Sequence, residues 1–234
     1  MEAATLRRDF KKKIKRESVL LPGAFNALAA KLVQRAGFKG VYISGAALSA
    51  GTGLPDIGLL TLSEFSALAK PIAQAVKLPC ICDADTGFGE AVNVMRTVQE
   101  YERIGLCGLH IEDQVLPKRC GHLPGKELVS TQAMVEKIRM AVESRTDKNF
   151  LIIARTDARA VEGMKGSLKR AEAYVKAGAD AVFPEALKTP EEFKKFVREM
   201  DVPLMANMTE FGVSPLLTYE ELADMGYRMV IFPV

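Results

Sequence analysis

The sequence predicts an α/β protein of the (β/α)8 TIM-type barrel class, with residues 1–234 forming a single domain. Two observations support this prediction: eight short apolar runs alternate with longer amphipathic stretches, and no linker rich in proline, glycine or serine divides the chain. Such alternation is typical of βα units around a parallel sheet. Barrels of this class commonly reach this length undivided.

An amphipathic helix is predicted first, over about residues 4–16. Leu6, Phe10 and Ile14 recur there every fourth position, and the opposite face carries most of the formal net charge of +3. A basic face of this kind can contact nucleic acid or anionic lipid. We interpret it instead as a solvated surface helix packed on the domain, so neither nucleic acid nor a membrane is expected as a partner.

Eight strands are predicted, and they begin at Ser18, Gly40, Pro79, Gly108, Phe150, Asp180, Val202 and Met229. Between them lie helical stretches such as 25–37, 91–105, 131–145 and 167–178. Several of these stretches end in glycine, where helices are expected to stop. The eighth strand ends the sequence, so the eighth helix and the C-terminal helices are absent from this prediction. Either the chain is truncated or another element covers that side.

The composition is that of a cytoplasmic globular protein. Hydrophobic residues make up 48% and charged residues 26% of the chain, and no apolar run approaches the roughly 20 residues of a membrane span. The charged amino terminus lacks the apolar region of a signal peptide. Cys80, Cys82 and Cys107 fall in predicted strands, match no zinc spacing and are expected in the core. Cys120 alone lies in a polar loop.

Acidic residues gather where predicted strands three and four end. The two-residue period of a strand puts Asp83 and Asp85 on one side, and Glu112 and Asp113 end the next strand. Active sites of barrels lie at the carboxyl ends of the strands, and carboxylate oxygens are the ligands that Mg²⁺ and Mn²⁺ prefer. The cluster predicts a metal site. The alternative is that these acids cap helices or pair with nearby basic residues.

Groups that bind anions follow the other strands. Tyr42 and Ser44 share a face at the end of strand two, and the glycines after them expose backbone N–H groups that can bind a carboxylate. This turn fits neither a P-loop nor a dinucleotide fingerprint. Strands five to seven end in Arg155, in Glu185, and in Asn207 followed by Thr209. Together these residues predict a ring of oxyanion binders around a metal.

The segment "VLPKRCGHLPG", residues 115–125, is too broken for a helix or strand. Its basic residues should favour the thiolate of Cys120, which makes this thiol a candidate acid or base; the alternative is an ordinary surface thiol. His122 belongs to the same basic loop. His110 lies inside an apolar strand and is interpreted as a hydrogen-bonded core residue. Proline and glycine should leave the segment able to close over a substrate.

Six motifs in one order, "DADTGFG", "HIEDQ", "PKRCGH", "ARTDA", "FPEA" and "ANMTEFG", resemble the isocitrate lyase and phosphoenolpyruvate mutase superfamily from about Val19 onward. "KRCGH" resembles the lyases, and the run from "FPEALKTPEEF" to "LLTYEEL" resembles the 2-methylisocitrate lyase family. The resemblance implies a retro-aldol cleavage of 2-methylisocitrate to pyruvate and succinate, in the methylcitrate cycle of propionate catabolism. It also implies a homotetramer where C-terminal helices are present and exchanged between subunits.

The resemblance further implies a role for each site residue. Asp85 would ligate Mg²⁺ directly, and Asp83 and Glu112 through water. Cys120 would protonate the succinate carbanion, Arg155 would neutralise the hydroxyacid carboxylate, and Tyr42 would accept the hydroxyl proton. The residues expected to bind substrate carboxylates are Ser44, Gly45, Gly121, His122, Glu185, Asn207 and Thr209. The residues expected to leave space for the substrate methyl are Phe183, Ile231 and Pro233.

Three alternatives to this function remain open from the sequence. Another superfamily member would act on isocitrate, on an oxaloacetate-like acid or on a phosphonate, although "KRCGH" argues against the last two. A Schiff-base aldolase would need a desolvated lysine at a strand end, and no predicted strand ends in one. A non-catalytic barrel would only bind an acid, which the full set of acids, Cys120 and Arg155 argues against.

Overall fold

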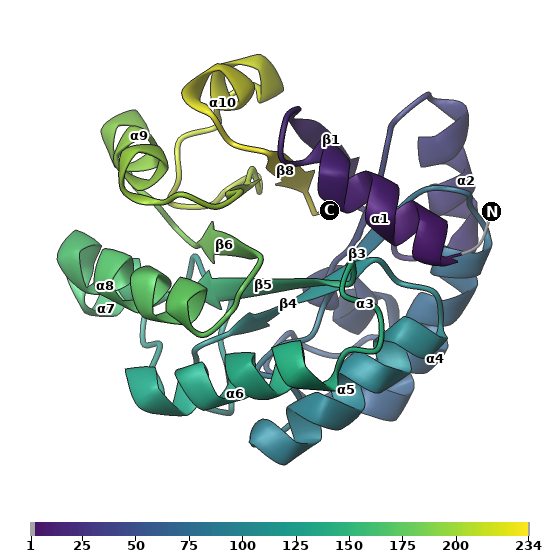
Figure 1. The fold of residues 1–234 in the computed structure, drawn as a ribbon, viewed down its shortest axis with the longest axis horizontal. Helices are drawn as coiled ribbons and strands as arrows, with labels where there is room; N and C mark the ends of the chain where they lie inside the picture. Colours follow the sequence, from purple (N-terminus) through teal and green to yellow (C-terminus); the bar gives the residue numbers. More distant parts are fainter. Residues whose placement is uncertain (1–2, 234) are drawn as a thin grey trace.

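The computed structural model describes residues 3–233 and has parallel strands at its centre with helices outside them (Figure 1). The strands are β1 (Val19–Pro22), β2 (Val41–Ile43), β3 (Cys80–Asp83), β4 (Gly108–Glu112), β5 (Leu151–Thr156), β6 (Ala181–Pro184), β7 (Met205–Asn207) and β8 (Met229–Phe232). All eight predicted strands are therefore confirmed. Seven lie within their predicted apolar runs, and β5 extends one residue beyond its run, to Thr156. The agreement arises because these runs are short and bounded by glycine, proline or charged residues.

Helices follow the strands along the chain. They are α1 (Ala3–Lys13), α2 (Ala27–Arg35), α3 (Gly45–Gly51), α4 (Leu62–Gln74), α5 (Ala91–Arg103), α6 (Thr131–Ser144), α7 (Ala158–Val161), α8 (Gly163–Lys176), α9 (Pro190–Glu199) and α10 (Tyr219–Met225). Hydroxyl side chains cap several of them; Thr61 and Thr218, for example, each accept a hydrogen bond at the start of a helix and form a capping box with a glutamate. Such caps satisfy backbone N–H groups that a helix start otherwise leaves unpaired.

The strands follow one another in the circular order of a barrel, but their hydrogen bonds form two sheets. One sheet has the order β2-β3-β4-β5-β6 and the other β1-β8-β7. Single parallel bridges join the sheets, Gly23 with Tyr42 and Val182 with Leu204. Pro22 and Pro203 lie at these two seams, and proline has no N–H to donate to a neighbouring strand. The prediction of a barrel is confirmed, whereas a hydrogen-bond ladder that closes without interruption is not observed.

Helix α1 packs against the amino-terminal side of the strands. Phe10 and Ile14 are buried in the cluster that fills the space between the strands, together with residues such as Leu151. The buried Arg7 donates to the carbonyl oxygens of Glu102, at 2.6 Å, and Leu106, at 2.8 Å, which lie just before β4. The apolar stripe predicted for this helix is therefore its packing face, and the carboxyl ends of the strands remain free for a site.

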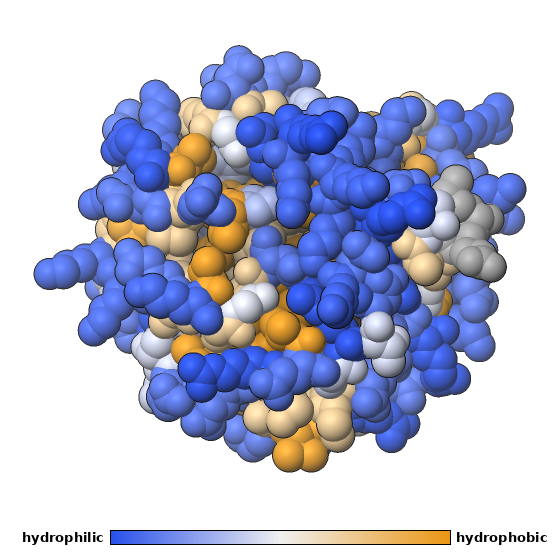
Figure 2. Space-filling model, viewed as in Figure 1, coloured by the Kyte–Doolittle hydropathy of each residue, from blue (hydrophilic) through white to orange (hydrophobic). Residues whose placement is uncertain are grey.

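The outer faces of the strands pack against the helices in two further apolar clusters. Cys80, Cys82 and Cys107 are buried, as predicted, and Cys120 is half-buried. The surface in Figure 2 is mostly hydrophilic, with apolar residues visible between charged side chains. Across residues 3–233, no helix combines the length and apolarity needed to span a membrane.

Candidate active site

Asp83 and Asp85 lie at the carboxyl end of β3, where Asp83 organises the backbone. Its Oδ1 accepts a hydrogen bond from the Asp85 N–H, at 2.9 Å, and its Oδ2 one from the Gly45 N–H, at 3.2 Å. A Cβ on Gly45 would lie 2.7 Å from Asp83 Oδ2, so only glycine allows this approach. Asp85 itself has a left-handed backbone, with φ of 44°. The structure therefore binds Gly45 to an acid of the protein rather than leaving its N–H group open.

Lys118 supplies positive charge beside these acids. Its ammonium lies 3.0 Å from Asp85 Oδ1 and also pairs with Asp56. Burial would lower the pKa of Lys118, but the surrounding carboxylates outweigh burial and raise it. Burial raises the pKa of Asp85 to about 6, with repulsion from Asp83 and Asp56 in the same direction and Lys118 opposing both. The sequence prediction missed Asp56, whose only signal was an acid in the loop between α3 and α4.

Glu112, at the end of β4, is almost wholly buried. Neither of its carboxylate oxygens has a hydrogen bond within residues 3–233, and Arg155 Nη2 lies 3.2 Å from Oε2. Burial raises the pKa of Glu112 well above its usual range, and the lowering effects of Arg155 and Lys118 do not offset this. A buried carboxylate left in this condition is costly unless a cation or proton compensates it.

These oxygens have the chemistry of a site for a hard cation. The two oxygens of Glu112 lack a hydrogen-bond partner in the part of the chain that the structure describes, and Asp85 Oδ1 has the Lys118 ammonium 3.0 Å away. Buried carboxylate oxygens of this kind suit Mg²⁺. Over the same residues, however, no group of three or more histidine, cysteine, aspartate or glutamate side chains is arranged closely enough to hold a metal ion. Lys118 and Arg155 provide the compensating charge instead, which is the arrangement anticipated as the alternative.

Arg155, on β5, is the most highly connected residue of the site. It donates from Nε to Asp157 Oδ2, at 2.9 Å, and from Nη2 to Asp157 Oδ1, at 3.2 Å. Its Nη1 lies 3.4 Å from Glu185 Oε2. The guanidinium also stacks over the ring of Phe183, 5.2 Å from the centroid. Three carboxylates, including Glu112, thus surround one buried guanidinium, and Asp157 was missed in the sequence although it follows Arg155 by two residues.

His122 and Glu185 form a second pair in this cluster. His122 Nε2 lies 3.1 Å from Glu185 Oε1, and His122 Nδ1 accepts a hydrogen bond from the Val213 N–H, at 3.1 Å. Since Nδ1 accepts, the ring proton lies on Nε2 and faces the carboxylate. Asn207 donates to Glu185 Oε2, at 3.3 Å. Burial would raise the pKa of Glu185, but Arg155 and His122 outweigh it and lower the pKa to about 2.

The loop of residues 115–127 lies directly against this cluster. A Cβ on Gly121 would fall 2.3 Å from Glu185 Cγ and 2.7 Å from Arg155 Nη2, so the backbone beside Cys120 touches both side chains. Thr209, by contrast, is half-buried and lies beside Gly212. The structure therefore brings the segment of Cys120 to Arg155 and Glu185, although these residues are far apart in the sequence.

Tyr42 and His110 are buried between the strands. The Tyr42 hydroxyl lies 2.8 Å from His110 Nε2, and His110 Nδ1 lies 3.6 Å from Asp83 Oδ1. Burial lowers the pKa of His110 to about 4 and raises the pKa of Tyr42 well above 10. Ser44 accepts a hydrogen bond from the Ala47 N–H, at 3.3 Å, and caps α3. The predicted open turn after β2 is therefore wrong, because this segment forms a short helix.

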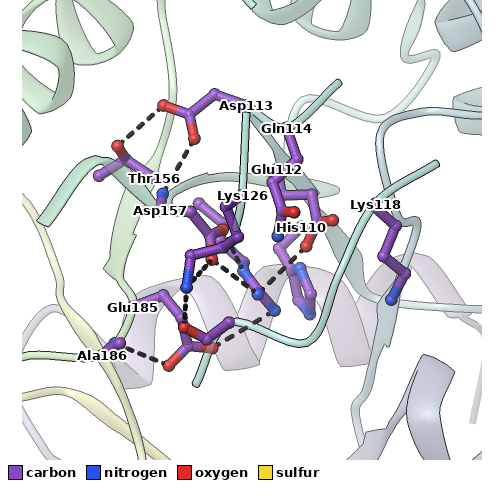
Figure 3. A network of polar contacts seen from close by, with 12 residues as sticks. His110, Glu112, Asp113, Gln114, Lys118, Lys126, Thr156, Asp157, Glu185 and Ala186 are labelled. Atoms are coloured by element: carbon purple, nitrogen blue, oxygen red, sulfur yellow. Dashed lines mark hydrogen bonds and ion pairs between the residues drawn. The ribbon is translucent and has the colours of Figure 1, made fainter. Parts of the chain in front are cut away.

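Asp113 faces away from its neighbour Glu112. It accepts hydrogen bonds from the Asp157 N–H, at 2.9 Å, and from the hydroxyls of Thr156 and Tyr174, both at 2.8 Å. Figure 3 shows Asp113 joined to Thr156 and Asp157 at the end of β5, apart from Glu112. Its inclusion among the possible metal ligands is therefore wrong, because adjacent residues of a strand point to opposite sides.

Phe183 and Ile231 pack in the apolar space between the strands. The Phe183 ring meets the His110 ring edge-on, with centroids 5.3 Å apart. A separate cavity lies beside Asp85, between Thr86, Phe88 and Leu116. It gives the acid cluster an approach from the surface on the side of α4 and α5.

Comparisons with known proteins agree with this fold and set of residues. A family model described as phosphoenolpyruvate phosphomutase matches residues 10–234. The 2-methylisocitrate lyase of Aeropyrum pernix is 53% identical over 220 residues, which are 94% of this chain and 71% of the relative. Probable 2-methylisocitrate lyase 2 of Corynebacterium glutamicum is 54% identical over 218 residues, with coverage of 93% and 71%.

Solved structures agree as well. The structure of 2,3-dimethylmalate lyase, a PEP mutase/isocitrate lyase superfamily member, has a TM-score of 0.94 and 38% identity, and the match covers all of this chain and 79% of that one. Phosphonopyruvate hydrolase in complex with oxalate and Mg²⁺ has a TM-score of 0.87 and 35% identity, with coverage of 100% and 81%. The resemblance inferred from the motifs is confirmed, and this chain belongs to the phosphoenolpyruvate phosphomutase family within the PEP mutase/isocitrate lyase superfamily.

Proposed function

We propose that this chain is a carbon–carbon lyase that cleaves 2-methylisocitrate to pyruvate and succinate by a metal-dependent retro-aldol reaction. The observation that carries the proposal is the loop of Cys120 folded onto Arg155 and Glu185, beside the acids of β3 and β4. It brings the segment that carries the thiol to a source of positive charge and to hard oxygen ligands. Relatives named 2-methylisocitrate lyase, about half identical over more than 90% of this chain, support the same substrate.

Asp85 and Glu112, with Asp83 behind them, are the residues we propose to hold Mg²⁺. The buried oxygens of Glu112, which lack hydrogen bonds within residues 3–233, and the burial of Asp85 support this assignment. The shared fold with a hydrolase whose structure holds oxalate and Mg²⁺ also supports it. When bound, the ion would stabilise negative charge on the α-hydroxycarboxylate end of the substrate. Lys118 lies beside Asp85 and keeps additional positive charge at this end.

Cleavage requires a proton acceptor at the substrate hydroxyl. A buried tyrosine with a raised pKa is protonated, so Tyr42 can take the hydroxyl proton only by passing its own proton on. His110 Nε2, 2.8 Å from the Tyr42 oxygen, is placed to receive it. Because burial lowers the pKa of His110 to about 4, the charged ring would depend for its stability on Asp83, on the other side of the imidazole. We propose this relay as the route of the proton that leaves the hydroxyl.

The electron pair of the broken bond passes to the succinate fragment, which then needs a proton. Cys120 is proposed to supply it from Sγ, since a thiol is a far stronger acid than a serine hydroxyl. Arg155 and the Nε2–H of His122 face the same region and are proposed to bind substrate carboxylates, in competition with Glu185. The cation and the thiol would thus act at opposite ends of the bond that breaks.

The test is product analysis with purified protein and Mg²⁺. We would incubate it separately with 2-methylisocitrate, isocitrate, 2,3-dimethylmalate and oxaloacetate and follow each mixture by NMR. Stoichiometric pyruvate and succinate from 2-methylisocitrate is the expected result. A folded protein that turns over none of these acids would contradict the proposal and favour a barrel that only binds them. Faster turnover of another acid would reassign the substrate.

A further inference from the structure

Gln114 forms an unusual contact with the loop of Cys120. This side chain is almost wholly buried at the end of β4. Its Nε2 donates to the Arg119 carbonyl oxygen, at 2.8 Å, and its Oε1 accepts from the Arg119 N–H, at 2.9 Å. One amide side chain therefore binds both backbone groups of the residue that directly precedes Cys120, as a neighbouring strand would.

The base of the loop is closed by backbone pairing. Gln114 forms an antiparallel bridge with Leu128, and the Val115 N–H donates to the Glu127 carbonyl oxygen, at 2.9 Å. The two ends of the loop are therefore held together, and the free part between them contains Cys120. What fixes this free part has to come from side chains.

Lys126 holds the backbone on the other side of Cys120. Its buried ammonium donates to the carbonyl oxygens of Gly121 and of Leu123, the latter at 3.1 Å. It also lies 3.9 Å from Asp157 Oδ1, the carboxylate that hydrogen-bonds Arg155. Figure 3 shows Lys126 reaching from the loop toward Asp157. The lysine thus links the loop to the group that orients Arg155.

We propose that Gln114 and Lys126 are positioning residues that fix the backbone on the two sides of Cys120 and so aim its thiol. The inference rests on the proposed function, in which Cys120 is the acid that protonates succinate. A displacement of about 1 Å at a reacting group can cost roughly 100-fold in rate. Two side chains bound to residues 119 and 121 restrict such displacement directly.

The proposal is tested with Gln114→Leu and Lys126→Met, each compared with Gln132→Leu, which removes an exposed glutamine that bonds only Glu136. Gln114→Glu keeps the acceptor for the Arg119 N–H and loses the donor, so its effect should be intermediate. Three measurements apply: the rate at which iodoacetamide alkylates Cys120, tryptic cleavage after Arg119, and kcat against KM. The other three cysteines are buried, so alkylation reports on Cys120.

Gln114→Leu and Lys126→Met should each be alkylated at Cys120, and cleaved by trypsin, faster than Gln132→Leu. Their kcat should be lower by roughly 10- to 100-fold, and their KM should change by less than about threefold. If Lys126→Met fails to fold, Gln114→Leu decides the question. The proposal would be overturned if alkylation, tryptic cleavage and kcat all match those of the control. It would also be overturned if alkylation and tryptic cleavage are faster while kcat is unchanged. If the wild type cleaves no 2-methylisocitrate, the proposed function fails. The positioning role of Gln114 and Lys126 is then judged from alkylation and tryptic cleavage alone: rates equal to those of the control would refute it, and faster rates would support it.

Discussion

The Lys118 ammonium lies 3.0 Å from Asp85 Oδ1, with both side chains buried. The two oxygens of the neighbouring Glu112 lack a hydrogen bond within residues 3–233. A lysine delivers one positive charge to an acid cluster that also includes Asp83 and Glu112. The negative charge of the cluster is therefore only partly neutralised, which favours binding of a divalent cation. Such a cation would compete with Lys118 for Asp85 Oδ1.

Metal binding should depend on Asp85. EDTA is expected to abolish activity, and Mg²⁺ or Mn²⁺ to restore it. Asp85→Asn should lose high-affinity Mn²⁺ binding, because the amide keeps the shape and removes the charge. Electron paramagnetic resonance of free Mn²⁺ measures this without any substrate. Asp9→Asn, at an exposed site on α1, is the matched control. Full activity in a metal-free preparation would refute the metal site.

Cys120→Ser should lower kcat by about 10²- to 10⁴-fold, the range for loss of a general acid. Serine is nearly the same size, so succinate binding, measured by calorimetry, should change little. The loss should therefore appear in kcat and leave KM within a few-fold of the wild type. Turnover close to that of the wild type would leave Cys120 with no role beyond packing.

Arg155 should be essential for stability as well as activity. Arg155→Met leaves Glu112, Asp157 and Glu185 buried without their shared counterion, and breaking a buried ion pair in this way costs about 3–5 kcal/mol. Arg159→Met is the control, because Arg159 pairs with Glu192 at a partly exposed site and should cost about 1 kcal/mol or less. Urea unfolding measures both. Equal losses would contradict the assignment of Arg155 as the central cation.

Glu185 should make stability depend on pH in the acid range. Its pKa is about 2 in the folded state against 4.5 as the ordinary value, so the folded state favours the carboxylate. This contribution is fully present above pH 4.5 and is lost as the pH falls toward 2. Between pH 7 and pH 3.5, the wild type should lose about 1 kcal/mol more than Glu185→Gln. The comparison uses urea unfolding at both pH values, and parallel losses would refute the pairing.

The backbone of this protein could be predicted because its signals are local. The eight strands follow from apolar runs, and the contact face of α1 follows from Leu6, Phe10 and Ile14. The prediction for the segment after β2 was wrong because Gly45 suggested an open turn. A Ser44 cap followed by alanines and leucine favours a helix, and this signal was available. The alternation of strand residues would likewise have separated Asp113 from Glu112.

The pairings within the site could not be predicted in this way. Lys118 reaches Asp56 across 62 residues, and Gln114 binds the backbone of Arg119. Neither contact leaves a periodic trace, because both depend on how a loop folds back over the strands. Arg155 was expected to meet a substrate carboxylate, yet it already contacts three carboxylates of the protein. Such competition is visible only once the strand ends are placed in space.

We expect a limited preference for the methylated substrate over isocitrate. Phe183 and Ile231 were expected to leave room for the substrate methyl group, and both are buried in the apolar space between the strands. Their contact with the methyl group stays a prediction. An extra methyl in an apolar pocket changes kcat/KM by about 10- to 200-fold. The ratio of kcat/KM for 2-methylisocitrate to kcat/KM for isocitrate should therefore lie in this range, so isocitrate should still be cleaved slowly. Steady-state assays of both acids measure it. A higher kcat/KM for isocitrate would make this chain an isocitrate lyase, because no pocket that favours the methyl group gives that order.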